Sequence, residues 1–406
     1  MAAAPARAAV AGGRPSPVAG LRQFAEKPVS YFAPRSVQFK KNNAVQNEQS
    51  GKNDMHVMTH GLRARRASAA VALFLLLALT FGAAQAQDKT QDKTYVMKVT
   101  LPTINDAPHQ FAKDFAALVE KDSGGRIKGE VYPASQLGSI PRQIEGVQFG
   151  AIQAAAVPPE FFVGVDERFE VMAAPGLVDS LEHGQRVAGD PAVLKLMLSL
   201  GANKGLHGVG LMMAQPSCVI SKTGIRHLAD FKGKKIRIFA SQFQSTAFDR
   251  LGATPVAMTL GDVLPALQQG AIDGSVAGIG PFVHLHFVDA AKYVTETNTP
   301  AIFIIMEVSQ KWYDSLPKDL QEVVDKDGAA VSKSINATAL KMYQEQRKAW
   351  TDGGGELISL PREEQAEMMR MLTSVGDDVS KTKPSVREAY DIVSDAAKRT
   401  RQAPSQ

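Results

Sequence analysis

The sequence has a single cysteine, Cys218, and this scarcity limits what the chain can be. One cysteine excludes an intrachain disulfide, and residues 87–406 are enough to bury a large core without one. Cys218 lies in the apolar-flanked stretch SCVIS, which favours a buried structural thiol over a nucleophile.

The common catalytic motifs are also missing. The sequence has no HExxH, no GxSxG, no phosphate-binding loop and no set of Cys and His at metal-ligand spacing. His284 and His286, in the stretch VHLHF, would face one way on a strand as a metal pair. No third ligand stands nearby, so a solvated or buried pair is favoured.

The longest hydrophobic run, near the N-terminus, is short for a membrane span, which needs ~20 residues. It follows Arg63, Arg65 and Arg66 and ends at the small residues before Gln87. This order is typical of a secretory signal peptide, here cut after Ala86. We therefore predict a signal peptide and export to the periplasm, with a retained membrane anchor as the alternative.

Positive charge is concentrated in the leader. Residues 1–54 are rich in Ala, Pro, Asn and Gln and are predicted to be a mis-assigned start or a disordered leader, followed by the signal peptide at 55–86. The whole chain has a net charge of +5. Residues 1–86 hold 11 Lys and Arg and 3 Asp and Glu, which leaves 35 basic and 38 acidic residues, a net charge of −3, in 87–406. The charge therefore gives no support to nucleic-acid binding.

Strand and helix periods alternate after the leader. Residues 94–101 and 127–133 alternate as strands, and 110–121 has apolar residues at helical spacing. This order predicts an α/β fold. Towards the C-terminus, 315–350 is predicted to be one long helix or two, and 360–381 another.

Two segments of the chain resemble each other. SIPRQIEGVQFGAIQA (139–154) aligns with TLGDVLPALQQGAIDG (259–274) at a constant offset of 120 residues. Each is typical of an amphipathic helix, a glycine stop and a short strand, with Thr259 as an N-cap and Gly150 and Gly270 in left-handed conformation. The repetition suggests two lobes of similar build, and the alternative is two unrelated units with common local chemistry.

Arg237 is a charged residue inside the apolar run IRIF. The stretch that begins at Ser241 is predicted to be a capping box that opens a helix, so Arg237 lies near the carboxyl end of a strand. Open α/β sheets bind ligands at that edge, and a guanidinium there can hold a carboxylate with two hydrogen bonds. The alternative is an arginine on the solvated face of an edge strand.

Four stretches together resemble the DctP-type solute-binding proteins of TRAP (tripartite ATP-independent periplasmic) transporters. They are FAKDFAALVEKDSGGRIKGEVYPASQLG, LADFKGKKIRIFAS, LGATPVAMTLGDVLPALQQGAIDG, and AAKYVTET with VSQKWYDSLP, across most of residues 95–320. The resemblance implies a two-lobe periplasmic-binding-protein-like α/β fold with mixed sheets, chain crossovers between lobes and a long bracing helix. It also implies that Arg237, in the motif KIR, holds the carboxylate of a ligand.

The family layout, projected onto this chain, gives the lobe boundaries. We expect lobe I first at 87–214, lobe II at 215–302, a return to lobe I with the bracing helix at 303–345, and lobe II with the C-terminal helices at 346–406.

Two departures from the family pattern bear on the ligand. Ala277 stands where many members have an asparagine, and no second arginine stands near Gln215, as it does in sialic-acid-binding members. They predict a monocarboxylate with a sizeable apolar or aromatic part rather than a sialic acid or a small dicarboxylate. Besides Arg237, the candidate contacts are Gln215, Ser217, Phe239, Ser241, Gln244, Asn105, His109, Met212, Met258, Ala277 and Phe282. For the apolar ones, ordinary core packing is the alternative.

The expected function is capture of an organic acid by lobe closure, for delivery to TRAP membrane permease subunits. No cofactor, metal or nucleic acid is expected to bind, and the protein is expected to be a monomer. The alternatives are a co-receptor for a membrane sensor, which would have the same pocket, a binding protein of an ATP-driven importer, and a periplasmic enzyme.

Overall fold

The computed structural model describes residues 93–401. The predicted leader at 1–54, the signal peptide at 55–86 and its cleavage site lie outside the described residues. Within 93–401 no helix is both long enough and apolar enough to span a bilayer.

Five strands form the first sheet, in the order β2-β1-β3-β10-β4. They are β1 (Tyr95–Thr100), β2 (Ile127–Tyr132), β3 (Ala154–Val157), β4 (Leu206–Pro216) and β10 (Ala301–Ser309). Strand β1 is parallel to β2 and β3, whereas β10 is antiparallel to β3 and β4. The sheet is therefore mixed. Helix α2 (Ala107–Asp122) connects β1 to β2, and α3 (Ile140–Phe149) connects β2 to β3.

Six strands form the second sheet, in the order β11-β9-β5-β8-β6-β7. They are β5 (Cys218–Ser221), β6 (Lys235–Ile238), β7 (Thr254–Ala257), β8 (Gly274–Ala277), β9 (Tyr293–Thr295) and β11 (Glu356–Ile358). Strand β6 is parallel to β7 and β8, and β5 is antiparallel to β8 and β9. Helix α6 (Gln242–Arg250) follows β6, α7 (Leu260–Gln269) precedes β8, and α8 (Ile279–His284) follows β8. We refer to the two sheets with these helices as the first and the second lobe.

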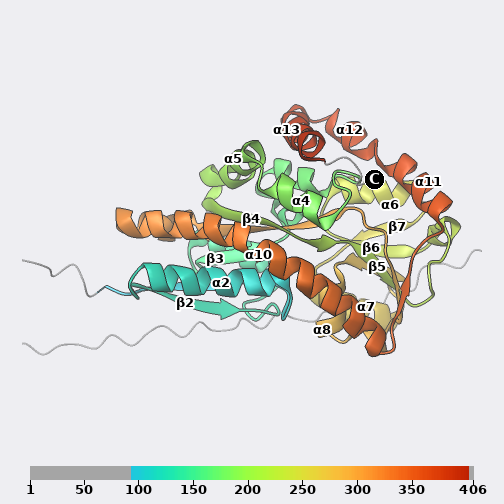
Figure 1. Ribbon diagram of the computed structural model, residues 1–406, viewed down its shortest axis with the longest axis horizontal. Coiled ribbons are helices and arrows are strands. Elements are labelled where there is room, and N and C mark those ends of the chain that lie inside the picture. The colour runs from blue at the N-terminus through green and yellow to red at the C-terminus, as the bar shows by residue number, and fades with distance from the viewer. Residues whose placement is uncertain (1–92, 402–406) are drawn as a thin grey trace, which may run out of the picture. The chain divides into compact units, whose positions relative to one another are not determined.

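The chain crosses between the lobes at β4–β5 and β9–β10 and again along α10 (Lys318–Asp352). Helix α10 contacts β4 and α2 of the first lobe and α8 and β11 of the second (Figure 1). The fold prediction is confirmed: the structure has two mixed α/β lobes, crossovers and a long bracing helix. The segment predicted as one helix or two is a single helix of 35 residues.

The other helices are short or C-terminal. They are η1 (Pro159–Phe162), η2 (Glu167–Ala173), α4 (Leu181–Ala188), α5 (Pro191–Ser199), η3 (Ala202–Lys204), η4 (Leu228–Phe231), η5 (Phe287–Asp289), α9 (Gln310–Asp314), α11 (Arg362–Leu372), α12 (Val375–Ser380) and α13 (Pro384–Thr400).

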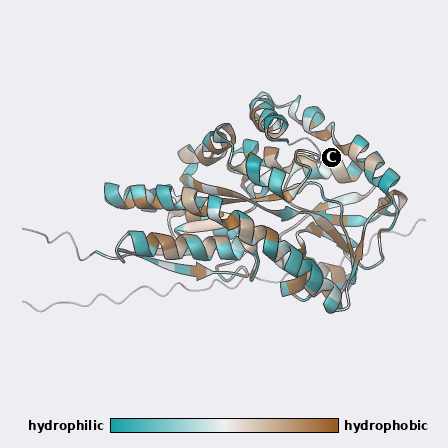
Figure 2. Cartoon of the chain, in the orientation of Figure 1, coloured by the Kyte–Doolittle hydropathy of each residue, from teal (hydrophilic) through white to brown (hydrophobic). Residues whose placement is uncertain are grey.

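The apolar period of α2 explains how that helix packs. Phe111, Phe115 and Val119 lie four residues apart on one face and are fully buried. They join the same apolar cluster as Val99 of β1 and Met306 of β10. Figure 2 shows hydrophilic residues between the apolar ones along α2 and α10, as expected of helices that bury one face.

The internal repeat forms equivalent elements in the two lobes. Helix α3 and strand β3 belong to the first sheet, and α7 and β8 to the second, 120 residues apart. Gly150 and Gly270 end the two helices with φ of 81° and 73°, in the predicted left-handed conformation. Thr259 is the N-cap residue of α7, but its hydroxyl donates to Asp262 Oδ2 at 2.6 Å instead of accepting from the backbone.

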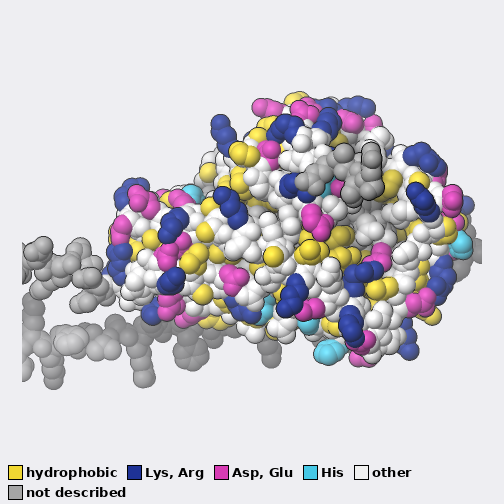
Figure 3. Space-filling model, viewed as in Figure 1, with side chains coloured by type: hydrophobic (Ala, Val, Ile, Leu, Met, Phe, Trp, Pro, Cys, Tyr) yellow, Lys and Arg dark blue, Asp and Glu magenta, His cyan; other side chains and the backbone are white. Residues whose placement is uncertain are grey.

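Charged side chains of both signs share the surface drawn in Figure 3, with Lys and Arg interspersed among Asp and Glu. This face carries no large region of a single sign. The mixture agrees with the small net charge of residues 87–406.

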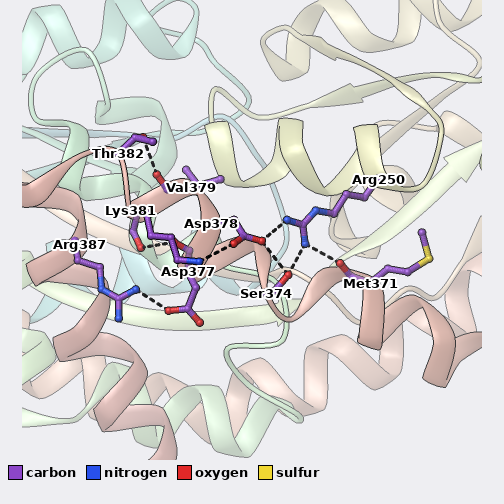
Figure 4. Close-up of polar contacts among 10 residues, drawn as sticks. Arg250, Met371, Ser374, Asp377, Asp378, Val379, Lys381, Thr382 and Arg387 are labelled. Carbon is purple, nitrogen blue, oxygen red and sulfur yellow. Dashed lines mark hydrogen bonds and ion pairs between the residues drawn. The ribbon is translucent and has the colours of Figure 1, made fainter.

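The C-terminal helices are attached to α6, the helix that follows Arg237 in the chain. Arg250, at the end of α6, donates to Met371 O at 2.9 Å, Ser374 Oγ at 2.7 Å and Asp378 Oδ2 at 2.6 Å (Figure 4). These contacts lie where α11 ends and α12 begins. The prediction of a single helix over 360–381 is wrong, because the structure has two helices there, α11 and α12.

Candidate ligand-binding site

A cavity of about 40 Å³ is lined by both lobes. The lining residues are Pro102, Thr103, Asp106, Pro108, Ile140, Ala156, Pro158, Phe161, Ala214, Gln215, Arg237, Phe239, Leu260, Ala277, Gly278, Pro281, Ile302 and Ile304. Most of these side chains are apolar. Only four of them, Thr103, Asp106, Gln215 and Arg237, carry polar groups, so those four decide which polar ligand groups fit.

The internal repeat contributes equivalent residues to opposite walls of this cavity. Three pairs, each 120 residues apart, line it: Ile140 with Leu260, Pro158 with Gly278, and Phe161 with Pro281. The first pair lies within the aligned segments 139–154 and 259–274, and the other two pairs continue the same offset just beyond them. The polar groups do not follow this pairing.

Arg237 is on the wall formed by the second lobe and is only 1% exposed. Its Nε donates to Met258 O and its Nη1 donates to Val276 O, both at 2.9 Å. The guanidinium carbon lies 4.7 Å from the ring centroid of Phe239. No ion pair formed within residues 93–401 includes Arg237.

Burial lowers the pKa of Arg237 to about 9, because desolvation disfavours the charged form. The side chain remains a cation at neutral pH. Two backbone carbonyls and an aromatic face hold it in place, but a carbonyl does not neutralise a charge. A buried cation of this kind is a site for an anionic ligand group.

The turn after β6 fixes the backbone beside Arg237. Ser241 caps α6 by accepting from Gln244 N at 3.4 Å, as predicted. In a full capping box the Gln244 side chain would accept from the backbone N–H of Ser241. Instead, Gln244 Oε1 accepts from Phe239 N at 2.9 Å. This bond helps to hold Phe239 between Arg237 and Phe161. The ring centroids of Phe239 and Phe161 are 5.4 Å apart.

Asp106 is on the wall formed by the first lobe, at the N-cap of α2, and is 1% exposed. Its Oδ1 accepts from Thr103 Oγ1 at 2.9 Å and from His109 N at 3.1 Å. Its Oδ2 is buried without a hydrogen-bond partner. Desolvation raises the pKa of Asp106 to about 7, against the lowering effect of those hydrogen bonds.

Gln215 is the penultimate residue of β4, just before the chain crosses between lobes, and it lines the cavity. Its Oε1 accepts from Ile279 N at 2.8 Å, so its amide group presents N–H donors. A Cβ at Gly278 would lie 2.2 Å from Gln215 Cδ, so a side chain at position 278 would displace the Gln215 amide from this place.

Four of the residues proposed from the sequence lie together around the cavity: Arg237, Gln215, Phe239 and Ala277. The others do not line it. Ser241 caps α6, and Met258 contributes its carbonyl to Arg237. The direct ligand contacts proposed for all these residues remain predictions.

Four further candidates lie near the cavity but not on its lining. Asn105 has φ of 56° and donates its backbone N–H to His109 Nδ1 at 3.0 Å. Phe282 packs on Phe287 at 5.3 Å between ring centroids. Ser217 is buried beside the crossover. Of the two remaining candidates, Met212 is buried in β4 and Gln244 makes the bond described above.

Asp106 was missed by the sequence analysis, although its neighbours Asn105 and His109 were named. The available signal was an aspartate three residues after Thr103 and directly before a helix, which is typical of an N-cap. Capping uses only one of the two carboxylate oxygens, and nothing in the local sequence indicates where the other one points.

The residues considered for other chemistry have structural explanations. His284 ends the short helix α8 and His286 is in a left-handed turn with φ of 55°, so the strand considered for them does not form. No group of three metal-ligating side chains occurs within 93–401. Cys218 is buried, as predicted, and burial raises the pKa of its thiol.

Two α/β lobes, chain crossovers and a cavity between them with a buried cation are features typical of solute-binding proteins. The family model of bacterial extracellular solute-binding protein family 7, DctP, matches residues 100–382, and the chain belongs to this family. Its members are binding proteins of TRAP transporters and not enzymes.

The relatives include the C4-dicarboxylate-binding periplasmic protein DctP of Rhodobacter capsulatus. It is 29% identical over 272 residues, which are 66% of this chain and 81% of the relative. A TRAP periplasmic solute-binding protein of Desulfovibrio salexigens with bound orotic acid has a TM-score of 0.71 and 20% identity, over 76% of this chain and all of that one. A similar protein of Xanthobacter autotrophicus Py2 with bound β-D-galacturonate has a TM-score of 0.68 and 23% identity, over 74% and 99%. At these identities the two structures show a shared fold.

Proposed function

We propose that this protein captures an organic acid outside the cytoplasm for the membrane subunits of a TRAP transporter. The observation that carries the proposal is the buried guanidinium of Arg237, which lines the cavity and forms no ion pair within the described residues. The ligands named for the related proteins, a C4-dicarboxylate, orotic acid and galacturonate, are all carboxylic acids and support this assignment.

A carboxylate is the ligand group that best satisfies Arg237. A guanidinium matches the two carboxylate oxygens with parallel hydrogen bonds, and the Nη groups not used by Val276 O are available for them. In a desolvated cavity the pair also removes the cost of a lone buried charge. The N–H donors of Gln215 on the same cavity favour an anionic group as well.

The apolar walls favour an acid with an apolar or aromatic part. Ala277 lines the cavity at the position where many family members place an asparagine. Phe161, Phe239 and Ile302 add aromatic and aliphatic surface. Burial of apolar ligand surface contributes roughly 25 cal/mol per Å² to binding. These walls therefore favour a ligand with more apolar surface over one with an additional charge.

Ligand entry requires the lobes to separate in this mechanism. Pockets that hold drug-sized ligands have volumes of about 300–1,000 Å³, whereas the cavity here has about 40 Å³. The crossovers at β4–β5 and β9–β10 are the segments about which a hinge motion would occur. A ligand stabilises closure only by the amount that it prefers the closed state.

The proposal is tested first by a thermal-shift screen of the exported protein against carboxylates, sugars and amino acids. A ligand at ~100 times its Kd adds about 2.7 kcal/mol of stability. We expect a shift with carboxylic acids that Arg237→Ala abolishes. A shift with sugars or amino acids, and with no acid, would mean that Arg237 is structural.

A further inference from the structure

We propose that Asp106 selects, among carboxylates, those that also carry a hydrogen-bond donor, O–H or N–H, at the end remote from Arg237. The inference rests on the proposed function, because the carboxylate must first be held by Arg237. The inference adds a second polar contact to the ligand, from the first lobe, and it narrows the expected ligands to carboxylates that carry a donor.

The observation that supports this inference is an unpartnered carboxylate oxygen on a residue that lines the cavity. Asp106 is 1% exposed, and its Oδ1 is already used by Thr103 Oγ1 and His109 N. Oδ2 is buried with no donor in the protein. A buried acceptor without a partner is destabilising because it has lost its hydrogen bonds to water, and a ligand that donates to it recovers that cost.

The other polar side chains of the cavity are donors, or are neutral groups that already take part in a hydrogen bond. Arg237 has only donors. Gln215 Oε1 accepts from Ile279 N, and the Thr103 hydroxyl donates to Asp106. Asp106 Oδ2 is thus the carboxylate acceptor left for a ligand among the four polar lining side chains. The complementary ligand has an acceptor group at one end and a donor at the other.

A second carboxylate is disfavoured in this position. It would bring a like charge against the Asp106 carboxylate in a desolvated cavity, and like-charge contacts of this kind serve to reject a wrong ligand. Burial raises the pKa of Asp106 to about 7, so the carboxylate is ionised at pH 8.5. At that pH the site should prefer a hydroxy acid to a dicarboxylate of the same skeleton.

The test is calorimetric titration at pH 8.5 with two matched ligand triplets. One triplet is butanoate, 4-hydroxybutanoate and succinate, and the other is benzoate, 4-hydroxybenzoate and terephthalate. We expect the hydroxy acid to bind tightest in at least one triplet. In Asp106→Asn the ratio of hydroxy-acid to dicarboxylate affinity should fall at least tenfold, since the amide is neutral and also donates.

The variants separate the binding role of Asp106 from its capping role. Asparagine caps a helix as well as aspartate does, so Asp106→Asn keeps the start of α2. Asp190→Asn is the matched control, because Asp190 caps α5 by accepting from Ala192 N at 2.9 Å and does not line the cavity. It should leave the affinity ratio unchanged.

Two results would overturn the inference, and they differ from each other. In the first result, acids bind in a manner that depends on Arg237, but Asp106→Asn leaves the affinity ratio unchanged, or the dicarboxylate binds tightest to the unmodified protein at pH 8.5. Asp106 is then not the residue that selects the ligand, and the proposed function stands. If no acid of either triplet or of the thermal-shift screen binds, both proposals fail together.

Discussion

Arg237 combines a buried charge with partial satisfaction by the protein. Its Nε and Nη1 are fixed by the carbonyls of Met258 and Val276, and Phe239 covers the guanidinium. These contacts set its orientation before any ligand arrives, which reduces the conformational entropy lost on binding. The same contacts make Arg237 part of the fold as well as of the site.

At the residue scale, Arg237→Ala should weaken binding of a carboxylate by about 2–5 kcal/mol, which is roughly 30-fold to several thousand-fold in Kd. Arg237→Lys keeps the charge but loses the planar guanidinium group. Its affinity for the carboxylate should therefore lie between that of the unmodified protein and that of Arg237→Ala. Calorimetric titration measures both. The exposed Arg142 of α3 provides the control, since Arg142→Ala should leave Kd unchanged. Equal affinities in all four proteins would remove Arg237 from the site.

A second residue-scale prediction concerns Glu160 of η1. Neither of its carboxylate oxygens has a hydrogen-bond partner, and burial, with a smaller effect of Glu170, raises its pKa to about 8. The folded protein therefore binds this proton more tightly than the unfolded chain does. Its contribution to stability is fully present below pH ~4.5 and is lost as the pH rises towards 8.

Glu160→Gln should remove this loss, so that the difference in the free energy of unfolding between variant and unmodified protein grows by a few kcal/mol, on the order of 1.4 per pKa unit, from pH 4.5 to 8. Urea unfolding at several pH values measures it. The exposed Glu145 is the control, because Glu145→Gln should not change the slope. Parallel pH profiles for Glu160→Gln and the unmodified protein would show that Glu160 does not titrate in this range.

At the element scale, α10 approaches β4 closely through one glycine. A Cβ at Gly328 would lie 2.3 Å from the backbone oxygen of Val209, and backbone cannot move aside as a flexible side chain does. Gly328→Ala should therefore destabilise the protein by ~1–3 kcal/mol, despite the better helix propensity of alanine. Gly261 of α7 has open space around its Cβ position, so Gly261→Ala should be neutral or stabilising by up to about 1 kcal/mol.

Urea unfolding of the two alanine variants tests the packing of α10. The substitution is chemically identical in both helices, so the difference in unfolding free energy between them isolates the contact with β4. Equal stabilities would mean that α10 is not packed this closely on the first lobe.

The elements that could be predicted from sequence are those whose signal is local. The apolar period of α2 and the glycine stops at Gly150 and Gly270 need only neighbouring residues, and the structure confirms them. At the break between α11 and α12, Ser374 and Asp378 accept hydrogen bonds from Arg250, which is more than a hundred residues away in the chain. The sequence of residues 360–381 alone cannot indicate that Arg250 will contact this segment.

The same distinction applies to the candidate site. Arg237 could be found because a charge inside an apolar run is a local anomaly, and the structure places it on the cavity. Asp106 could not, since an N-cap aspartate is common and the unpartnered Oδ2 is a property of the packed protein. Met258 lies close to Arg237 in space, but its contribution is a backbone carbonyl that accepts from the guanidinium. Ser241 lies close to Arg237 in the sequence, but its side chain caps α6.

At the scale of the whole molecule, closure of the lobes should be visible as a change in size. Addition of a saturating carboxylate is expected to reduce the radius of gyration measured by small-angle X-ray scattering, because the ligand links Arg237 of one lobe to the walls of the other. Arg237→Ala should not contract at the same ligand concentration. An unchanged radius in the unmodified protein with bound ligand would contradict the hinge motion.

The repeated cavity walls have a consequence for how long a ligand stays bound. Ile140 with Leu260, and Phe161 with Pro281 at the same offset of 120 residues, place apolar side chains of both lobes around the cavity. In the proposed mechanism, a ligand on either separated wall keeps only part of its contacts. Residence time then depends on how often the lobes part rather than on the grip of one lobe. A transporter supplied by such a protein would then receive ligand at a rate set by how often the lobes open.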